Sequence, residues 1–309
     1  MATHVIVGKG AVGSTLAQEL VAQGNDVLVV SRSGGTDTDT GSARVRHIAL
    51  DATDTSALTR AFQGADVVYN CANPSYWRWV SDWPPLAAAL LDAAARTGAV
   101  LVTAGNLYGY GTHRAVMFED TPLQASEAKG AVRAQMWRDA AARTDLRTTE
   151  VRAADYFGPR ADSQAMAGPR FLNPILAGKV ARTVVAVDQP HSWTYLPDFA
   201  RALVAAGTTP AAWGRGWHVP TAEPLTFLEL GDRFAAAAGA PKPRIRPMAA
   251  GMVRALGKVS PLLREVAAVA DHFTEPFVMD TTASQRTLGM SATPWDQAIV
   301  ETLAAPARV

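Results

Sequence analysis

The first apolar run of this chain leads directly into a glycine-rich loop, and this arrangement constrains the fold more than any other feature of the sequence. Residues 5–7 are Val-Ile-Val, and Gly8-Lys9-Gly10-Ala11-Val12-Gly13 follows them. A helical stretch and a second apolar run, at residues 27–30, come next. A strand, a G-x-G-x-x-G turn and a helix within about 30 residues form the unit that binds a dinucleotide, with its pyrophosphate at the helix N-terminus.

Each glycine of this loop has an expected task. Gly8 permits the tight turn, Gly10 lets the pyrophosphate approach the backbone, and Gly13 lets the helix pack against the strand. The other loop residues are also expected to lie against the cofactor: Lys9, Ala11 and Val12.

The end of the second strand indicates which dinucleotide binds. NAD-selective sites usually carry an acidic residue there, which accepts hydrogen bonds from the ribose hydroxyls. This chain has Ser31-Arg32-Ser33 instead, with Arg32 nineteen positions after Gly13. A guanidinium forks onto a 2′-phosphate and the serine hydroxyls add donors, whereas a carboxylate would repel the phosphate. The sequence therefore predicts NADP(H) as the cofactor.

Composition and charge narrow the kind of partner. The chain has 309 residues, of which 29 are basic and 28 acidic, so its net charge is +1. A net charge this small gives no overall electrostatic attraction for nucleic acid or an anionic membrane. A small-molecule substrate is therefore the expected partner. No uncharged apolar stretch is long enough to span a bilayer and no signal segment precedes the first strand, so a cytoplasmic location is expected. The single cysteine, Cys71, allows no internal disulfide.

Strand-like and helix-like segments alternate through the first half of the chain. Strands are expected at residues 4–7, 27–30, 46–50, 67–70, 100–103 and 148–153, with helices such as 57–62 and 86–96 between them. This alternation predicts an α/β fold with a Rossmann-like, doubly wound parallel sheet. After Gly158 the pattern becomes irregular and proline-rich, which indicates a smaller C-terminal substrate lobe. The predicted dinucleotide-binding domain comprises residues 1–158 and about 191–216, and the predicted lobe comprises residues 159–190 and 217–309.

Several short motifs occur in the order typical of one protein family. They are Asp51-Ala52-Thr53-Asp54, Asn70-Cys71-Ala72, residues 103–109 (TAGNLYG), residues 152–159 (RAADYFGP) and residues 193–198 (WTYLPD). Together with the glycine loop, they make nearly the whole chain resemble the extended short-chain dehydrogenases/reductases of the NAD-dependent epimerase/dehydratase type. The resemblance implies that Asp51 and Ala52 contact the adenine, and that Cys71 and Ala72 border the cofactor.

The catalytic residues of that family are altered in this chain. The family uses a serine or threonine together with Tyr-x-x-x-Lys, and none of the six tyrosines here has a lysine four positions later. Aligned from the neighbouring motifs, Lys129 takes the place of the tyrosine and Arg133 that of the lysine. The serine position falls on Ala104, with Thr103 and Asn106 as neighbours that would substitute. The resemblance thus supports the fold and the cofactor and leaves the reaction open.

Lys129 and Arg133 are four residues apart, which places them on one face of a helix. A partly desolvated lysine beside a second cation has a lowered pKa, so Lys129 is expected to act as a general acid or to stabilise an enolate. Arg133 would stay charged and hold the ribose or phosphate of the cofactor, and Tyr108 is a second candidate proton donor. The alternatives are an exposed helix with two solvated cations and a tyrosine that only packs.

Aromatic residues gather after the strand that borders the cofactor. Tyr76, Trp77 and Trp79 are expected on a loop that forms the wall of a pocket for a ring-containing or apolar substrate, with core packing and a subunit contact as alternatives. Asp155, at the family's asparagine position, and the adjacent Tyr156 are further candidates for substrate contact. Asp155 would equally pair with an arginine.

The sequence favours one function and leaves two alternatives. The favoured function is NADP(H)-dependent reduction of a small, ring-containing or apolar organic substrate, with hydride transfer assisted by Lys129. The alternatives are an NADP-retaining epimerase or dehydratase on a sugar-like substrate and a degenerate NADP(H) sensor. His113, His191 and His218 show no metal-ligand spacing, so no metal is expected and each is assigned to loop hydrogen bonding. The resemblance is also compatible with a homodimer.

Overall fold

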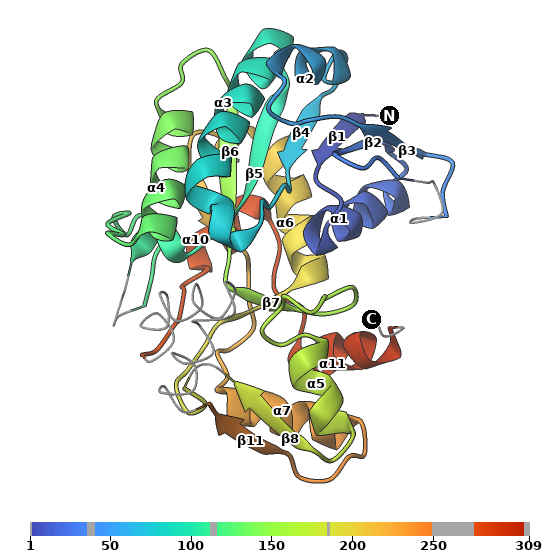
Figure 1. The fold of residues 1–309 in the computed structure, drawn as a ribbon, viewed down its shortest axis with the longest axis vertical. Coiled ribbons are helices and arrows are strands. Elements are labelled where there is room, and N and C mark those ends of the chain that lie inside the picture. Colours follow the sequence, from blue (N-terminus) through green and yellow to red (C-terminus); the bar gives the residue numbers. More distant parts are fainter. Residues whose placement is uncertain (1, 36–40, 112–115, 184–185, 249–274, 306–309) are drawn as a thin grey trace.

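A seven-stranded parallel sheet forms the centre of the molecule (Figure 1). The computed structural model describes residues 2–35, 41–111, 116–183, 186–248 and 275–305. The strand order is β3-β2-β1-β4-β5-β6-β10, so the direction of winding reverses between β1 and β4. The strands are β1 (Thr3–Val7), β2 (Asp26–Ser31), β3 (Val45–Ala49), β4 (Val67–Asn70), β5 (Val100–Asn106), β6 (Thr148–Ala153) and β10 (Gly216–His218). The predicted doubly wound parallel sheet is confirmed.

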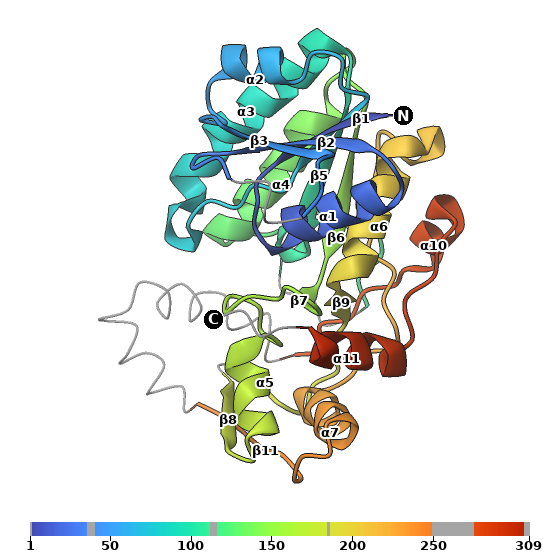
Figure 2. The ribbon, with the colours of Figure 1, turned by 90° about the vertical axis from the view of Figure 1, so that its right-hand side faces the viewer.

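Helices cover both faces of this sheet (Figure 2). The helices on one face are α1 (Ala11–Ala22) and α6 (Leu196–Thr208), and those on the other are α2 (Thr55–Ala61), α3 (Trp79–Thr97) and α4 (Ala128–Ala141). Side chains of a strand point alternately to its two faces, so a strand buried on both sides is apolar throughout. In β1, Ile6 joins the core against α1 and α6, whereas Val5 and Val7 join the core against α2 and α3.

The aromatic segment after β4 is helical, contrary to the expected loop. A short 3-10 helix, Tyr76–Arg78, leads into α3, which begins at Trp79 and contains two prolines. Trp79 and Trp83 are one turn apart and only 4% and 0% exposed. Burying about 150 Å² or more of each indole contributes about 4 kcal/mol at about 25 cal/mol per Å², which offsets the roughly 3 kcal/mol that a proline costs inside a helix.

Side-chain caps and glycines set the ends of the helices around β4. The Asp54 carboxylate accepts a hydrogen bond from the amide of Ala57 at 2.9 Å, which caps the first turn of α2. The last helix turn of α3 is closed by Gly98, whose φ of 72° lies in the left-handed region that glycine adopts without strain. Both helices are therefore held in place by signals within their own sequence.

The chain forms a smaller lobe below the sheet in Figure 1, around an aromatic core. Its elements are β7 (Asp155–Phe157), α5 (Pro169–Leu176), β8 (Val180–Thr183), β9 (Trp193–Tyr195), α7 (Phe227–Ala237), β11 (Arg244–Pro247) and α11 (Trp295–Ala304). Two parts of the predicted lobe segment 217–309 lie with the sheet instead. These are the end of β10 and helix α10 (Thr282–Leu288), which contacts α6 and β10. Among the described helices, none is long and apolar enough to cross a membrane.

A buried polar network connects β6, β10 and the turn after β5. Arg152 Nε donates to Glu150 Oε2 at 2.7 Å, and its Nη1 donates to the Tyr110 hydroxyl at 2.7 Å. That hydroxyl lies 2.7 Å from His218 Nε2, and His218 Nδ1 lies 2.6 Å from the carbonyl oxygen of Asp280. Burial lowers the pKa of His218 to about 4, so the folded protein keeps this ring neutral.

Acid is expected to destabilise the protein through His218. The unfolded chain protonates this ring near pH 6.5, whereas the folded chain keeps it neutral down to about pH 4. The unfolded state therefore binds more protons within this window, and the free energy of unfolding should fall by about 3 kcal/mol as the pH drops through it. Urea unfolding at a series of pH values measures the loss. His218→Gln should be less stable at neutral pH and should lose less on acidification; an equal acid loss in both proteins would assign the effect to other groups.

Candidate cofactor and substrate site

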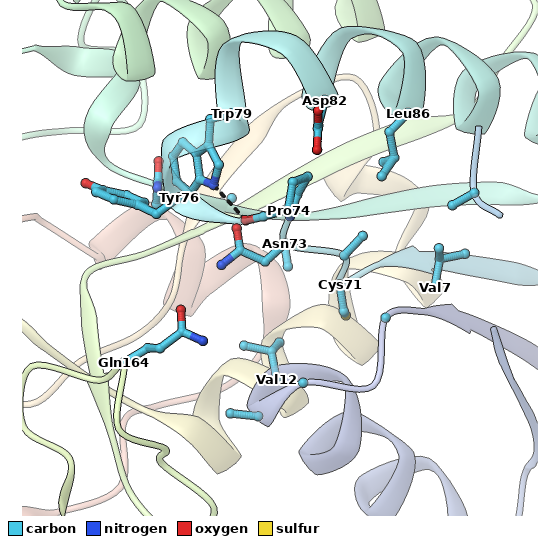
Figure 3. A pocket seen from close by; sticks show the side chains of 18 of the residues that line it. Val7, Val12, Cys71, Asn73, Pro74, Tyr76, Trp79, Asp82, Leu86 and Gln164 are labelled. Atoms are coloured by element: carbon cyan, nitrogen blue, oxygen red, sulfur yellow. Dashed lines mark hydrogen bonds between the residues drawn. The ribbon is translucent and has the colours of Figure 1, made fainter. Parts of the chain in front are cut away.

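One cavity of about 730 Å³ runs along the carboxyl ends of the central strands (Figure 3). It extends from the glycine loop and the end of β2 to a group of aromatic and acidic residues at the start of the lobe. The predicted cofactor residues that line it are Gly8, Lys9, Gly10, Ala11, Val12, Ser31, Arg32, Ser33, Asp51, Ala52, Cys71 and Ala72. Ligands of doubly wound sheets bind at this edge, where the winding reverses, so the cavity lies where a dinucleotide is expected.

The three loop glycines differ in what surrounds them. Gly8 has a φ of +110°, and a Cβ there would lie 2.5 Å from the carbonyl oxygen of Cys71. A Cβ on Gly13 would lie 2.0 Å from the carbonyl oxygen of Gly8, whereas a Cβ on Gly10 would meet nothing within 4 Å. Gly8 and Gly13 are thus required by the packing of the protein itself. Gly10 instead borders open space inside the cavity.

Positive charge and hydroxyl donors gather at the end of β2. Lys9 Nζ donates to the carbonyl oxygen of Gly34 at 2.6 Å, and the Ser31 hydroxyl donates to the same oxygen at 2.8 Å. Arg32 is exposed at the cavity mouth and contributes to lowering the pKa of the Asp51 carboxyl, after the larger effect of hydrogen bonds from Thr53. Two separate loops therefore bring one cation each to this end of the cavity, Lys9 and Arg32, and residues 31–33 include no carboxylate.

Cys71 forms part of the cavity wall beside the glycine loop. Its side chain is buried, and burial raises the pKa of the thiol to about 12. The sulfur is therefore a protonated packing atom at neutral pH.

Arg133 is held between two indole rings of α3. Its guanidinium carbon lies 4.6 Å from the Trp79 ring centroid and 4.3 Å from that of Trp83. The side chain is 7% exposed and lines the cavity, and its buried Nε and Nη1 have no hydrogen-bond partner within the part of the chain that the structure describes. Burial lowers the pKa of Arg133 to about 10, so the group remains a cation at neutral pH.

Lys129 is also buried, at 6% exposure, so the alternative of an exposed helix with two solvated cations is wrong. Its amide and that of Gly130 each donate to the Glu127 carboxylate at 2.7 Å, which caps the start of α4. Lys129 Nζ lies 4.5 Å from the centre of the Tyr76 ring. The lysine is not among the residues that line the cavity, so the expectation that it touches the substrate or cofactor is not supported by its position.

Tyr76 and Tyr108 form the aromatic wall at the far end of the cavity, together with Trp79. The Tyr76 hydroxyl donates to the Tyr108 hydroxyl at 3.4 Å, and the rings of Tyr76 and Trp79 meet edge to face at 5.0 Å. Trp79 is fixed by its Nε1, which donates to the carbonyl oxygen of Pro74 at 3.1 Å (Figure 3). Trp77 does not join this wall, because it points outward and is 54% exposed.

The pKa of Tyr108 is raised well above its ordinary value. Burial is the main cause, followed by the neighbouring Tyr76 and by the charge of Asp155. Tyr108 is therefore a protonated hydrogen-bond donor at neutral pH, and loss of its proton is costly. Asn106 also lines the cavity and its side-chain oxygen accepts a hydrogen bond from the Tyr108 amide at 3.2 Å, whereas Thr103 lies outside the lining.

Asp155 and Tyr156 line the cavity where the chain passes from β6 into the lobe. Among the described residues, Asp155 pairs with His191 and not with an arginine: its Oδ2 lies 3.0 Å from His191 Nε2. Sequence reasoning placed His191 only in loop hydrogen bonding and missed Gln164, which faces the cavity from the lobe, opposite Asn73 in Figure 3. Neither His191 nor Gln164 belongs to one of the sequence motifs, so the sequence did not indicate a role in the cavity for either.

Two histidine predictions have other outcomes. His113 lies outside the described residues, and His218 belongs to the buried network described above. Within the described part of the chain, no group of three or more His, Cys, Asp or Glu side chains is arranged to hold a metal ion.

Comparison with known proteins identifies the family. Residues 5–219 match the family model described as NAD dependent epimerase/dehydratase family. A curated relative, 3beta-hydroxysteroid-dehydrogenase/decarboxylase isoform 2 of Arabidopsis thaliana, is 25% identical over 234 residues, which cover 66% of this chain and 40% of that protein. The chain thus spans less than half the length of this relative.

Solved structures share the fold at low sequence identity. A UDP-N-acetylglucosamine 4-epimerase from Methanobrevibacter ruminantium, in complex with UDP-N-acetylmuramic acid, superposes with a TM-score of 0.80 at 15% identity, over 98% of this chain and 97% of that one. A dTDP-glucose 4,6-dehydratase from Bacillus anthracis, in complex with NAD, gives a TM-score of 0.79 at 13% identity, over 98% and 96%. A UDP-glucose 4-epimerase from Thermotoga maritima, with UDP-glucose, gives 0.77 at 17%, over 97% of each chain.

Proposed function

The chain belongs to the NAD dependent epimerase/dehydratase family, and we propose that it is an NADP(H)-dependent oxidoreductase that reduces a carbonyl group of a small, ring-containing substrate. The observation that carries this proposal is one continuous cavity that joins the glycine loop and Arg32 to the aromatic wall around Tyr108. Its two ends suit different parts of the reaction. The Arg32 end offers cations and hydroxyls for phosphates, and the Tyr108 end offers rings, a protonated phenol and a carboxylate for a substrate.

The residues at the Arg32 end fit a dinucleotide. The open space beside Gly10 admits a pyrophosphate close to the backbone, at the start of α1. Arg32 and Ser33, with Lys9 beside them, would bind a 2′-phosphate, and the absence of a carboxylate at residues 31–33 removes the usual preference for NAD. When bound, the cofactor supplies the hydride, and the protein supplies orientation and charge.

Arg32→Ala is expected to weaken NADPH binding about 30-fold and to leave NADH binding nearly unchanged. A hydrogen-bonded contact between charged groups contributes about 2 kcal/mol, and only NADPH carries the 2′-phosphate. Calorimetric or fluorescence titration of both dinucleotides measures the effect. Arg44→Ala is the matched control, because Arg44 lies at the opposite, amino ends of β2 and β3, pairs with Asp26 at 3.1 Å, and is outside the cavity lining. Tighter binding of NADH than NADPH by the wild type would overturn the assignment of NADP(H).

At the other end, the side chains would orient the substrate and stabilise charge. Tyr76, Trp79 and Tyr108 form a surface on which a ring stacks. The Tyr108 hydroxyl, protonated at neutral pH, would donate a hydrogen bond to the carbonyl oxygen as negative charge develops on it. Arg133 adds a fixed positive charge at the wall. Lys129 would hold the Tyr76 ring in place, because its ammonium group lies over the face of that ring.

The function is tested by following NADPH absorbance with a panel of cyclic ketones, quinones, enones and ring-containing aldehydes. Oxidation that depends on one carbonyl class, with formation of the matching alcohol, is the expected result. Tight NADPH binding with no oxidation across the panel would contradict a reductase.

A second candidate is an epimerase or dehydratase that retains its dinucleotide and acts on a sugar nucleotide. It is supported by the names of the structural neighbours, which include enzymes solved with UDP-glucose and UDP-N-acetylmuramic acid. Such a reaction needs a base at the position that Lys129 occupies here, and this side chain lies outside the cavity lining. Conversion of UDP-glucose or dTDP-glucose without net change in NADPH would favour this candidate over the reductase.

A further inference from the structure

Asp155 and His191 form a pair of ionisable side chains at the substrate end of the cavity. The Asp155 carboxylate lies 3.0 Å from His191 Nε2 and its side chain is 18% exposed, whereas that of His191 is 5% exposed. Asp155 lines the cavity, and His191 lies behind it. An ionisable group that lines a site and lies within hydrogen-bond reach of a second ionisable group meets the geometric requirement for passing a proton between them.

The lobe fixes both members of the pair. Asp155 begins β7, which runs parallel to β9, and it lies opposite Trp193 in the register of the two strands. The His191 ring stacks on Phe277 at 5.0 Å between ring centres and packs against Trp193 at 4.5 Å. Phe277 lines the cavity as well, so the imidazole is held just beneath the cavity surface. A ring enclosed in this way keeps its Nε2 directed at Asp155.

The remaining ionisable groups at this end of the cavity leave the pair as the proton carrier. Burial raises the pKa of Tyr108 and of Tyr156, and the charge of Asp155 contributes to both shifts. These phenols therefore keep their protons near neutral pH. The other charged or ionisable side chains on the elements packed around Asp155 are Asp162, Tyr76, Lys129 and Arg133. Among the hydrogen bonds of the described residues, Asp155 Oδ2 lies 3.0 Å from His191 Nε2, whereas Asp162 Oδ1 accepts from the amide of Gln164.

We propose that Asp155, coupled to His191, transfers the proton of the reaction and so replaces the tyrosine that the family pattern has at the position of Lys129. This inference rests on the proposed function. As the carbonyl carbon receives the hydride and is reduced to an alcohol, its oxygen takes a proton that passes from His191 through the Asp155 carboxylate, and NADPH is oxidised to NADP⁺. His191 then regains a proton from solvent. Tyr108 keeps its proton throughout and acts as a hydrogen-bond donor.

Proton release on cofactor binding tests the pair without a known substrate. The oxidised nicotinamide is positively charged and the reduced one is neutral, so NADP⁺ bound beside the pair should favour its deprotonated form. In weakly buffered solution near neutral pH with a pH indicator, we expect NADP⁺ to release up to about one proton per chain and NADPH to release fewer. Asp155→Asn and His191→Gln should each abolish this difference. Asp162→Asn is the matched control: it removes a cavity carboxylate that is bonded to the Gln164 amide and should leave the difference in place.

Each outcome decides the proposal. Equal release with NADP⁺ and NADPH by the wild type, or a difference that persists in both pair variants, would overturn the role of Asp155 and His191 while leaving NADP(H) binding intact. Failure of the wild type to bind either dinucleotide would instead overturn the proposed function, and the pair with it. Because Asp155→Asn keeps the size of the side chain, its thermal unfolding and NADPH affinity serve to show that the variant is folded.

Turnover gives a second, independent readout. With a carbonyl compound that the wild type reduces, Asp155→Asn should lower kcat about 100-fold with little change in the KM for NADPH, because general acid catalysis contributes about 100-fold or more. A kcat within about threefold of the wild type would contradict proton transfer by Asp155.

Discussion

Gly13→Ala is expected to destabilise the protein by at least about 3 kcal/mol in the absence of any ligand. The added Cβ would lie 2.0 Å from the carbonyl oxygen of Gly8 and 3.3 Å from the Ile6 side chain, so α1 would have to move away from β1. The contact involves backbone on both sides, which no change of side-chain rotamer relieves. Urea unfolding monitored by tryptophan fluorescence measures the loss, and purified Gly13→Ala should also fail to bind NADPH.

Gly10→Ala is the matched control for this prediction. A Cβ on Gly10 would meet nothing within 4 Å, so the variant should unfold at nearly the same urea concentration as the wild type. If the pyrophosphate lies against this residue, Gly10→Ala should nevertheless weaken NADPH binding. The two alanines would thus separate a packing glycine from a ligand glycine. Equal stability of the two variants would contradict the close approach of α1 to β1.

The glycine loop and the sheet were predictable because both depend on local sequence. The loop residues and the apolar runs beside them lie within one βαβ unit, and the alternation of strands and helices continues through β6. The lobe boundary was less predictable, since α10 and the end of β10 return to the sheet through contacts that cross the lobe segment. These contacts depend on packing between residues that are distant in the sequence, so the pattern of apolar residues along the chain does not indicate them.

The substrate end was predictable only in outline. Alignment of short motifs placed Lys129, Arg133 and Tyr108 near one another. In the structure Arg133 and Tyr108 line the cavity and Lys129 does not, because the alignment did not give the direction of the side chains. Lys129 lies over the Tyr76 ring and Arg133 lies between two indoles, because α3 begins seven residues earlier than the expected residue 86 and carries Trp79 and Trp83 to α4. The contact of Asp155 with a histidine 36 residues away is set by the pairing of β7 and β9.

The Glu150–Arg152 pair on β6 is a further feature that only the three-dimensional structure reveals. The side chains of Glu150 and Arg152 are almost fully buried, at 6% and 3% exposure, and the other residues of β6 are buried as well. Glycines on the neighbouring strands make room for them. A Cβ on Gly105 would lie 2.5 Å from Glu150 Oε1, and a Cβ on Gly216 would lie 2.6 Å from Arg152 Nη2. Two charged residues are therefore accommodated in β6, an interior strand of this sheet, because the strands on both sides of it carry glycine opposite them.

Glu150→Ala should lower the free energy of unfolding by about 3 to 5 kcal/mol, because it leaves the Arg152 guanidinium buried without its counterion. The bond to Tyr110 would remain, but that hydroxyl carries no compensating charge at neutral pH, since burial raises the pKa of Tyr110 to about 12. Asp26→Ala is the matched control: it breaks the exposed pair with Arg44, whose side chains are 40% and 56% exposed, and should cost less than about 1 kcal/mol. Urea unfolding of the three proteins at neutral pH measures both differences. Similar losses in the two variants would mean that water or a rearranged side chain compensates the charge of Arg152 in place of Glu150. The side chains of β6 would then rearrange more readily than their close packing against Gly105 and Gly216 implies.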